Sequence, residues 1–246
     1  MGILEAPAPL FAWLDAQMEG LLPPWGRLVA WGAIAALVSM GLYRFLSAQG
    51  RIARGKRDLA RARQELDAYD GELEGAWPLI RGLLRAAFRQ VGRVGGPAVA
   101  ASLPLLSLLI WLSTAYGYAY PPPGTEPVIR SQPAELEARW RAARSRGTGD
   151  QAVPHVVVAD GDGRVLAEVA LREPVPVLHK WRWWNALVGN PAGYLPANGG
   201  VERLRLELPR QEVLPLGPSW ARGWELSFFL ALVVASVALK VLFRIE

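Results

Sequence analysis

The chain has 246 residues, of which 52% are hydrophobic and 20% charged, with a formal net charge of +5 and no cysteine. The missing cysteine excludes disulfides, thiolate nucleophiles and cysteine metal sites, and two histidines, His155 and His179, are too few for a histidine-rich metal centre. The apolar residues stand in charge-free blocks, which is typical of an integral membrane protein and not of a nucleic-acid reader.

Three segments have the roughly 20 apolar residues that a helix needs to cross a bilayer. These predicted spans are residues 25–46, 96–117 and, together with a cytoplasmic tail, 223–246. Pro104 is expected to kink the second span, and Arg27 and Arg44 near the ends of the first can reach the headgroups. The acidic residues before the first span, without a small-residue cleavage site after it, favour a retained helix over a cleaved signal peptide.

The density of Lys and Arg predicts the orientation of the spans. The connection 47–95 holds ten of them, residues 1–24 hold none, and the long segment 118–222 holds 13. Because short basic connections remain in the cytoplasm, we predict that 47–95 is cytoplasmic and that 1–24 and 118–222 lie outside. Lys240 and Arg244 agree with a cytoplasmic C-terminus. The predicted location is the inner membrane of a prokaryotic cell.

The cytoplasmic connection has the pattern of a helical hairpin. Its first arm, Gln49–Glu74, repeats apolar residues every seven positions, and small or aromatic residues follow three positions later. The first set is Ile52, Leu59, Leu66 and Leu73, and the second is Gly55, Ala62, Tyr69 and Ala76. This heptad seam predicts a coiled-coil arm that binds a partner protein. Gly75 and Pro78 are expected to end it.

The second arm, Leu79 to about Arg93, is amphipathic. One predicted face consists of Ile80, Leu84, Ala87 and Val91, and a basic stripe consists of Arg81, Arg85, Arg89 and Arg93. Two interpretations remain open. The stripe binds the anionic membrane surface, or it is a solvated face of a helix that packs its apolar side on the first arm. Gly95, Gly96 and Pro97 are expected to end this arm.

Residues 118–222 have the patterns of a small α+β domain. The predicted elements are a helix over Ala134–Arg146 and strands over Val153–Ala159, Arg164–Leu171 and Val201–Leu208. The first two strands flank Asp-Gly-Asp-Gly, a strong hairpin signal. A calcium loop at Asp160 and Asp162 is the less favoured alternative, because Leu171 stands where a calcium loop has its glutamate.

Aromatic residues predict contact with the outer membrane surface in two further places. One is the segment 180–196, with Trp181, Trp183 and Trp184, and the other is the amphipathic segment Leu10–Leu22. No spacing of acids, bases or nucleophiles points to catalysis, and no glycine-rich phosphate loop is present. We therefore expect no enzymatic activity, no cofactor and no metal.

Polar residues within the spans form the candidate site. Serines in spans often only assist packing, whereas a cation at the bilayer centre costs about 2.5–3.5 kcal/mol. Arg44 and Lys240 therefore either anchor the spans to headgroups or belong to a partly hydrated, positive groove that opens to the cytoplasm. The groove residues would be Ser39, Arg44, Ser107, Ser236 and Lys240.

The order of these parts, with LYRFLSAQGRIARGKRDLARARQEL after the first span and GWELSFFLALVVASVALKVLFRI at the C-terminus, resembles the YidC/Oxa insertase superfamily. It resembles most the three-span branch, which contains the archaeal YidC-like proteins and the third subunit of the endoplasmic-reticulum membrane protein complex. The resemblance implies three transmembrane helices, a cytoplasmic coiled-coil hairpin and a polar groove through which membrane proteins are inserted.

The partners expected from the resemblance are the lipid bilayer, nascent or partner membrane proteins, and a ribosome or a larger membrane complex. A structural or assembly subunit of such a complex, built on an insertase-like core, is the alternative. The outside segment 118–222 and its tryptophans favour this alternative, because exposed aromatic patches often meet partners. An ion channel on the same core is a third interpretation, but no selectivity-filter pattern supports it.

Overall fold

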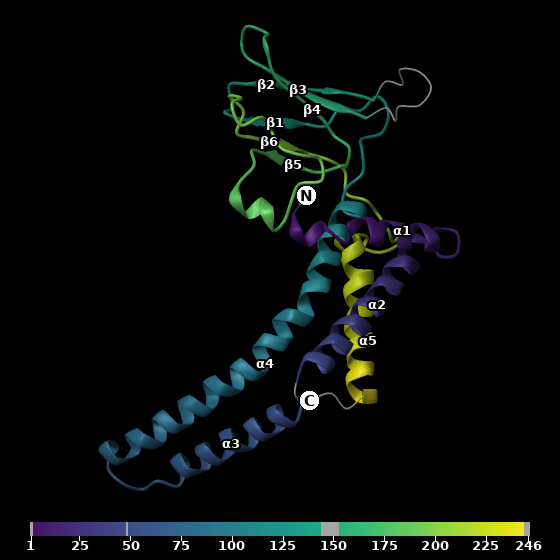
Figure 1. Ribbon diagram of the computed structural model, residues 1–246. Coiled ribbons are helices and arrows are strands. Elements are labelled where there is room, and N and C mark those ends of the chain that lie inside the picture. The colour runs from purple at the N-terminus through teal and green to yellow at the C-terminus, as the bar shows by residue number, and fades with distance from the viewer. Residues whose placement is uncertain (1, 48, 144–152, 244–246) are drawn as a thin grey trace. The chain divides into compact units, whose positions relative to one another are not determined.

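The computed structural model describes residues 2–47, 49–143 and 153–243 (Figure 1). The chain divides into two compact units. The first unit contains Met1–Leu28 and Ser107–Ser227, and the second contains Val29–Leu106 and Phe228–Glu246. Arg244 and most of the segment between Arg141 and Val153 lie outside the described residues.

Three helices are long and apolar enough to cross a membrane, and they confirm the three predicted spans. They are α2 (Pro24–Leu46), α4 (Leu73–Ala115) and α5 (Trp224–Phe243). A shorter helix, α1 (Ala8–Glu19), precedes the first span and covers most of the predicted amphipathic segment Leu10–Leu22. The part of the chain described is therefore that of a multi-pass helical membrane protein with a small region of strands.

Helix α4 is unbroken over 43 residues, although it contains Pro78, Pro97 and Pro104. The expected helix ends at Gly75 and Pro78, and again at Gly95 and Pro97, are therefore wrong. A proline within a helix removes one hydrogen bond. The helix-forming and apolar residues on both sides supply enough other hydrogen bonds to continue it, as membrane helices commonly do.

The predicted hairpin is present, but its turn comes earlier than expected. The first arm is α3 (Gln49–Asp67), and the second is the N-terminal part of α4. The heptad seam of α3 faces inward: Ile52 and Gly55 are buried, Leu59 and Leu66 are half-buried, and the side chain of Leu73 lies outside the described part. A Cβ at Gly55 would collide with the Gln90 amide of α4, so the arms approach closely here.

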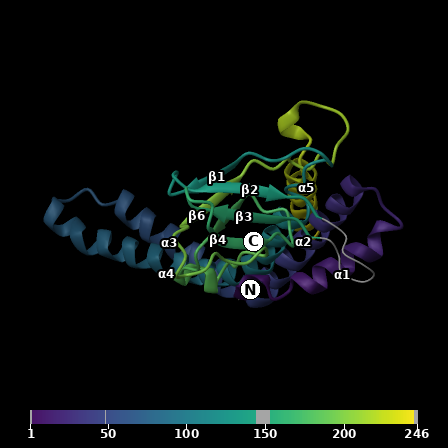
Figure 2. The same ribbon diagram turned by 90° about the horizontal axis from the view of Figure 1, so that it is seen from above.

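The strand region consists of two three-stranded antiparallel sheets. One has the order β1 (Ile129–Gln132), β6 (Arg203–Leu206), β5 (Val177–His179), and the other has β2 (Glu137–Arg141), β3 (His155–Ala159), β4 (Val165–Ala170). The two sheets overlap when seen from above (Figure 2). Apolar side chains from both sheets form one core, which includes Val156, Val158, Leu178, Leu204 and Leu206.

The hairpin predicted around Asp-Gly-Asp-Gly is confirmed as β3 and β4. Its turn is held by Asp160, whose carboxylate accepts hydrogen bonds from the backbone N–H groups of Asp162 and Arg164. Gly163 has φ of 80°, a conformation that favours glycine. These contacts show that Asp160 and Asp162 belong to a hydrogen-bonded turn. Across the described residues, no cluster of three or more His, Asp or Glu could hold a metal ion.

The third predicted strand is confirmed as β6, but it pairs with β1 and β5 and lies outside the β3–β4 sheet. The predicted helix over Ala134–Arg146 is wrong, because Glu137–Arg141 forms β2. The side chains of this segment alternate between exposed and buried, with Trp140 directed into the core. Pairing with β3 therefore overrides the helical composition of the segment.

Candidate functional site

Two of the spans pack closely within the second unit. Helices α2 and α5 lie side by side and run in the same direction (Figure 1). A Cβ placed on Gly32 of α2 would lie 2.7 Å from the Phe228 carbonyl oxygen and 2.8 Å from the Cβ of Ala231. Gly32 therefore lets the backbones of the two helices meet, as small residues commonly do between membrane helices.

Two of the predicted groove residues continue the faces that meet at Gly32. Ser39 comes seven residues after Gly32, about two turns further along the same face of α2. Ser236 comes four residues, about one turn, after Leu232 of α5, whose backbone nitrogen would lie 3.0 Å from the same Cβ, and both serines are half-buried. The Ser39 hydroxyl is buried and has no hydrogen-bond partner among the described residues. A hydroxyl in this state favours a water molecule or a polar group of another chain beside it.

The two predicted cations lie further along the same helices. Arg44 is in the last turn of α2 and Lys240 is in the last turn of α5, and both side chains are exposed. A cation at this end of a helix is favoured by the helix dipole. Ser107 belongs to the first unit, where it is buried. Four of the five predicted residues therefore lie on α2 and α5, and the groove itself stays a prediction.

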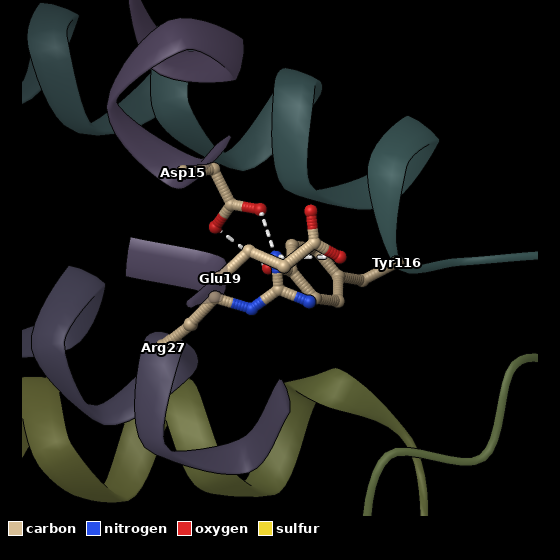
Figure 3. A network of polar contacts seen from close by, with 4 residues as sticks. All are labelled: Asp15, Glu19, Arg27 and Tyr116. Carbon is tan, nitrogen blue, oxygen red and sulfur yellow. Dashed lines mark hydrogen bonds and ion pairs between the residues drawn. The ribbon is translucent and has the colours of Figure 1, made fainter. Parts of the chain in front are cut away.

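A polar network in the first unit joins α1 to the ends of α2 and α4 (Figure 3). The Arg27 guanidinium donates a hydrogen bond to Asp15, with 2.7 Å between Nη1 and Oδ2. The Tyr116 hydroxyl donates to the other carboxylate oxygen of Asp15, also at 2.7 Å. The guanidinium carbon lies 5.6 Å from the centre of the Tyr116 ring, and Glu19 adds a longer ion pair of 3.8 Å to Arg27.

The network corrects the interpretation of Arg27 as a headgroup anchor. The side chains of Arg27 and Asp15 are only 12% and 13% exposed, so the pair lies largely out of water. Removing one member of such a pair leaves the other charge buried, which commonly costs about 3–5 kcal/mol. The sequence carries a signal for it, because Asp15 and Glu19 stand one turn apart in α1 and precede the first cation of the chain.

The hairpin contributes the remaining predicted residues. The four arginines of the basic stripe all lie on α4, and all are exposed. They are Arg81, Arg85, Arg89 and Arg93. The Arg81 guanidinium carbon lies 5.4 Å from the centre of the Trp77 ring. The seam residues Ile52, Leu59 and Leu66 pack inside the hairpin, so binding of another protein by these residues stays a prediction.

No family model matches the chain, and neither a curated protein nor a solved structure shows significant similarity to it. The resemblance to the YidC/Oxa superfamily therefore depends on the order of the parts and on the quoted segments.

Proposed function

We propose that the chain is not an enzyme and that it assists the insertion or assembly of other membrane proteins. The observation that carries this proposal is the unpartnered, buried Ser39 hydroxyl on the face of α2 that carries Gly32 and meets α5, and α5 itself holds the half-buried Ser236. Arg44 and Lys240 follow at the ends of the same two helices. Together they are suited to a polar path along a pair of otherwise apolar helices.

Such a path would act by lowering a desolvation barrier. A polar or acidic flank of a client segment meets a large free-energy cost in hydrocarbon, and hydroxyls with nearby cations replace part of the water that it loses. A cation 4 Å from a carboxylate contributes ~4 kcal/mol at an effective dielectric of 20 but only ~1 kcal/mol in bulk water. The effect is therefore largest where water is scarce.

The proposed orientation places residues 1–24 and 118–222 outside the cell membrane of a prokaryote and the hairpin in the cytoplasm. The high density of Lys and Arg in residues 47–95 supports it. A single cysteine at exposed Gln64 should then resist membrane-impermeant thiol reagents in intact cells, while one at exposed Val128 should react. The chain has no cysteine of its own, so each variant gives one signal. The opposite pattern would reverse the topology.

Insertion of two reporter proteins tests the function. One reporter has an acidic flank outside its span and the other a neutral flank. Arg44→Ala should impair insertion of the acidic reporter and spare the neutral one, and Arg44→Lys should keep most activity because it retains the charge. If wild type, Arg44→Ala and cells without the protein insert both reporters equally, the proposal is wrong.

A structural or assembly subunit of a larger membrane complex is the second candidate. The segment that contains Trp181, Trp183 and Trp184 favours it, because all three rings are exposed, and Trp183 is 72% exposed. Purification in a mild detergent separates the two candidates. An insertase should bring ribosomes and mixed nascent chains, whereas a scaffold should bring one fixed set of subunits.

A further inference from the structure

The second arm of the hairpin has two unlike faces. The face toward α3 includes the buried Ala76, the half-buried Ile80 and Ala87, and Gln90, whose amide donates to the Ile52 carbonyl at 3.4 Å. Leu84 and Val91, which spacing predicts on the same face as Ile80, are exposed. Because they come four residues after Ile80 and Ala87, they lie at the edge of the face that packs on α3, where α3 does not cover them.

Large apolar side chains follow this uncovered side. Trp77, Leu84, Phe88 and Val91 are 53%, 51%, 74% and 67% exposed. Their spacing of seven, four and three residues puts all four on one face of a helix. We call these four residues the outer stripe. Where side chains of α3 are described, the first arm has no counterpart, because its exposed residues are Gly50, Ala60 and polar or charged residues.

After Glu74, which comes three residues before Trp77, the outer stripe is bordered by positive charge. Arg81, Arg85 and Arg89 lie along one edge of it, and no Asp or Glu occurs between Glu74 and Glu126. The outer surface of α3 carries both signs, since Arg57 and Arg61 alternate there with acids such as Asp58. A surface that matches the second arm must therefore be both apolar and negatively charged.

The outer stripe continues into the span without interruption. Helix α4 is unbroken, and Val99 lies eleven residues after Phe88 on the same face, with 65% of its surface exposed. Eleven residues make about three turns, so the exposed apolar face leads directly from the arm to the segment that crosses the bilayer. The partner of the arm is thus expected to adjoin the partner of the span.

We propose that the outer stripe and its bordering arginines dock on the surface of an anionic phospholipid bilayer. The rings and aliphatic side chains enter the region between headgroups and acyl chains, and Arg81, Arg85 and Arg89 bind the lipid phosphates. Docking leaves the seam with α3 intact and requires α4 to bend between the arm and the span, at Gly95, Gly96 and Pro97, where glycines and a proline let a helix kink. It fixes the direction of the hairpin relative to the bilayer through lipid charge, a property separate from the insertion activity proposed above.

Single-cysteine variants of the full chain test this docking. An environment-sensitive fluorophore is attached at Phe88→Cys, or at the control Gln64→Cys on the exposed side of α3. Each protein is reconstituted into vesicles of phosphatidylcholine alone or mixed with phosphatidylglycerol. Both leaflets have the same composition, so the direction of insertion does not matter. We expect a blue shift and increased intensity at position 88 only in the anionic vesicles, and equal spectra at position 64.

Two charge variants with equal net charge complete the test. Replacing Arg81, Arg85 and Arg89 by Gln should lower the docking equilibrium on the order of 100-fold, since each arginine at such a surface contributes about fivefold. Replacing Arg54, Arg57 and Arg61 of α3 by Gln should leave it unchanged. A water-like spectrum at position 88 in anionic vesicles would overturn the proposal. Equal loss with both triple variants, or a blue shift that depends on protein concentration and not on lipid, would do the same.

Discussion

The strand region and the spans treat apolar side chains in opposite ways. Val156, Val158 and Leu204 in the strands are fully buried within their own unit, whereas α5 exposes Leu230 and Val241 at 62% and 74%. The strands close a core of their own, as a domain in water must. The apolar surface of the helices stays exposed and is suited to contact with lipid. The two regions should therefore respond differently to the same kind of substitution.

The largest expected effect is a charge in the core of the strand region. Leu204→Asp buries a carboxylate between the two sheets without a partner, and we expect loss of the region's fold, at a cost of several kcal/mol. Limited proteolysis of the full chain in detergent measures this as new cleavage within residues 118–222. The neighbouring Arg203→Asp is the control, because Arg203 is exposed on the same strand. Equal protection of both variants would contradict the closed core.

Breaking the Arg27–Asp15 pair should be the next largest effect. Asp15→Ala leaves the Arg27 charge buried, and we expect about 3–5 kcal/mol of destabilisation. Glu19→Ala should change stability by less than about 1 kcal/mol, because Glu19 is 70% exposed. Thermal unfolding of the purified chain measures both. Replacing Asp15 by Leu and Arg27 by Met together should recover much of the loss, which a purely steric role of Asp15 would not allow.

Contact between the spans should be sensitive to volume at one glycine. Gly32→Val places side-chain atoms against the backbone of α5, and we expect about 1–3 kcal/mol of destabilisation. Gly41→Val is the matched control, because a Cβ at Gly41 meets no atom within 4 Å. Thermal unfolding in detergent compares the two. If Gly41→Val is as destabilising as Gly32→Val, close packing of α2 on α5 is not what limits the size of residue 32.

The smallest effect concerns pH in the strand region. Partial burial raises the pKa of the Glu173 carboxyl, so the folded state holds this proton more tightly than the unfolded state does. Its contribution to stability is present at pH values below the ordinary pKa of glutamate and is lost as pH rises through the raised pKa. Glu173→Gln should therefore flatten the fall in unfolding temperature above about pH 4. If the slope of unfolding temperature against pH is unchanged, groups other than Glu173 cause this pH dependence.

The same carboxylate affects a neighbouring phenol. Burial, with a smaller contribution from Glu173, raises the pKa of Tyr120 to about 12. The Tyr120 hydroxyl donates a hydrogen bond of 2.8 Å to the Leu171 carbonyl and so remains a donor well into alkaline pH. In Glu173→Gln an absorbance titration of this phenol should give a lower pKa than in the wild type.

The sequence predicts the features that depend on local composition and spacing. Hydropathy finds the three spans, and the Asp-Gly-Asp-Gly turn finds the β3–β4 hairpin, because each signal lies within one segment. Features that depend on distant partners are missed. Glu137–Arg141 becomes a strand only by pairing with β3, and the contact between Asp15 and Tyr116 joins residues 101 positions apart.

The candidate site also combines features that spacing predicts with features that depend on packing against distant residues. Spacing alone puts Ser39 on the face of α2 that carries Gly32, but the burial of its hydroxyl depends on the packing around it. The second arm shows the limit most clearly. Spacing predicts a single apolar face for this arm, and the position of α3 divides the residues of that face between a covered and an uncovered part.

The two oxygens of Asp15 impose an order on biosynthesis. One binds Arg27, 12 residues later, and the other binds the hydroxyl of Tyr116, which the ribosome adds 89 residues after Arg27. At about 5–20 residues per second, that interval lasts about 4–18 s. Throughout it, the hydrogen bond from the Tyr116 hydroxyl to the second oxygen cannot form. The network around α1 is therefore completed only after the second span has been synthesised, so the first span enters the bilayer before α1 is tied to the end of that second span.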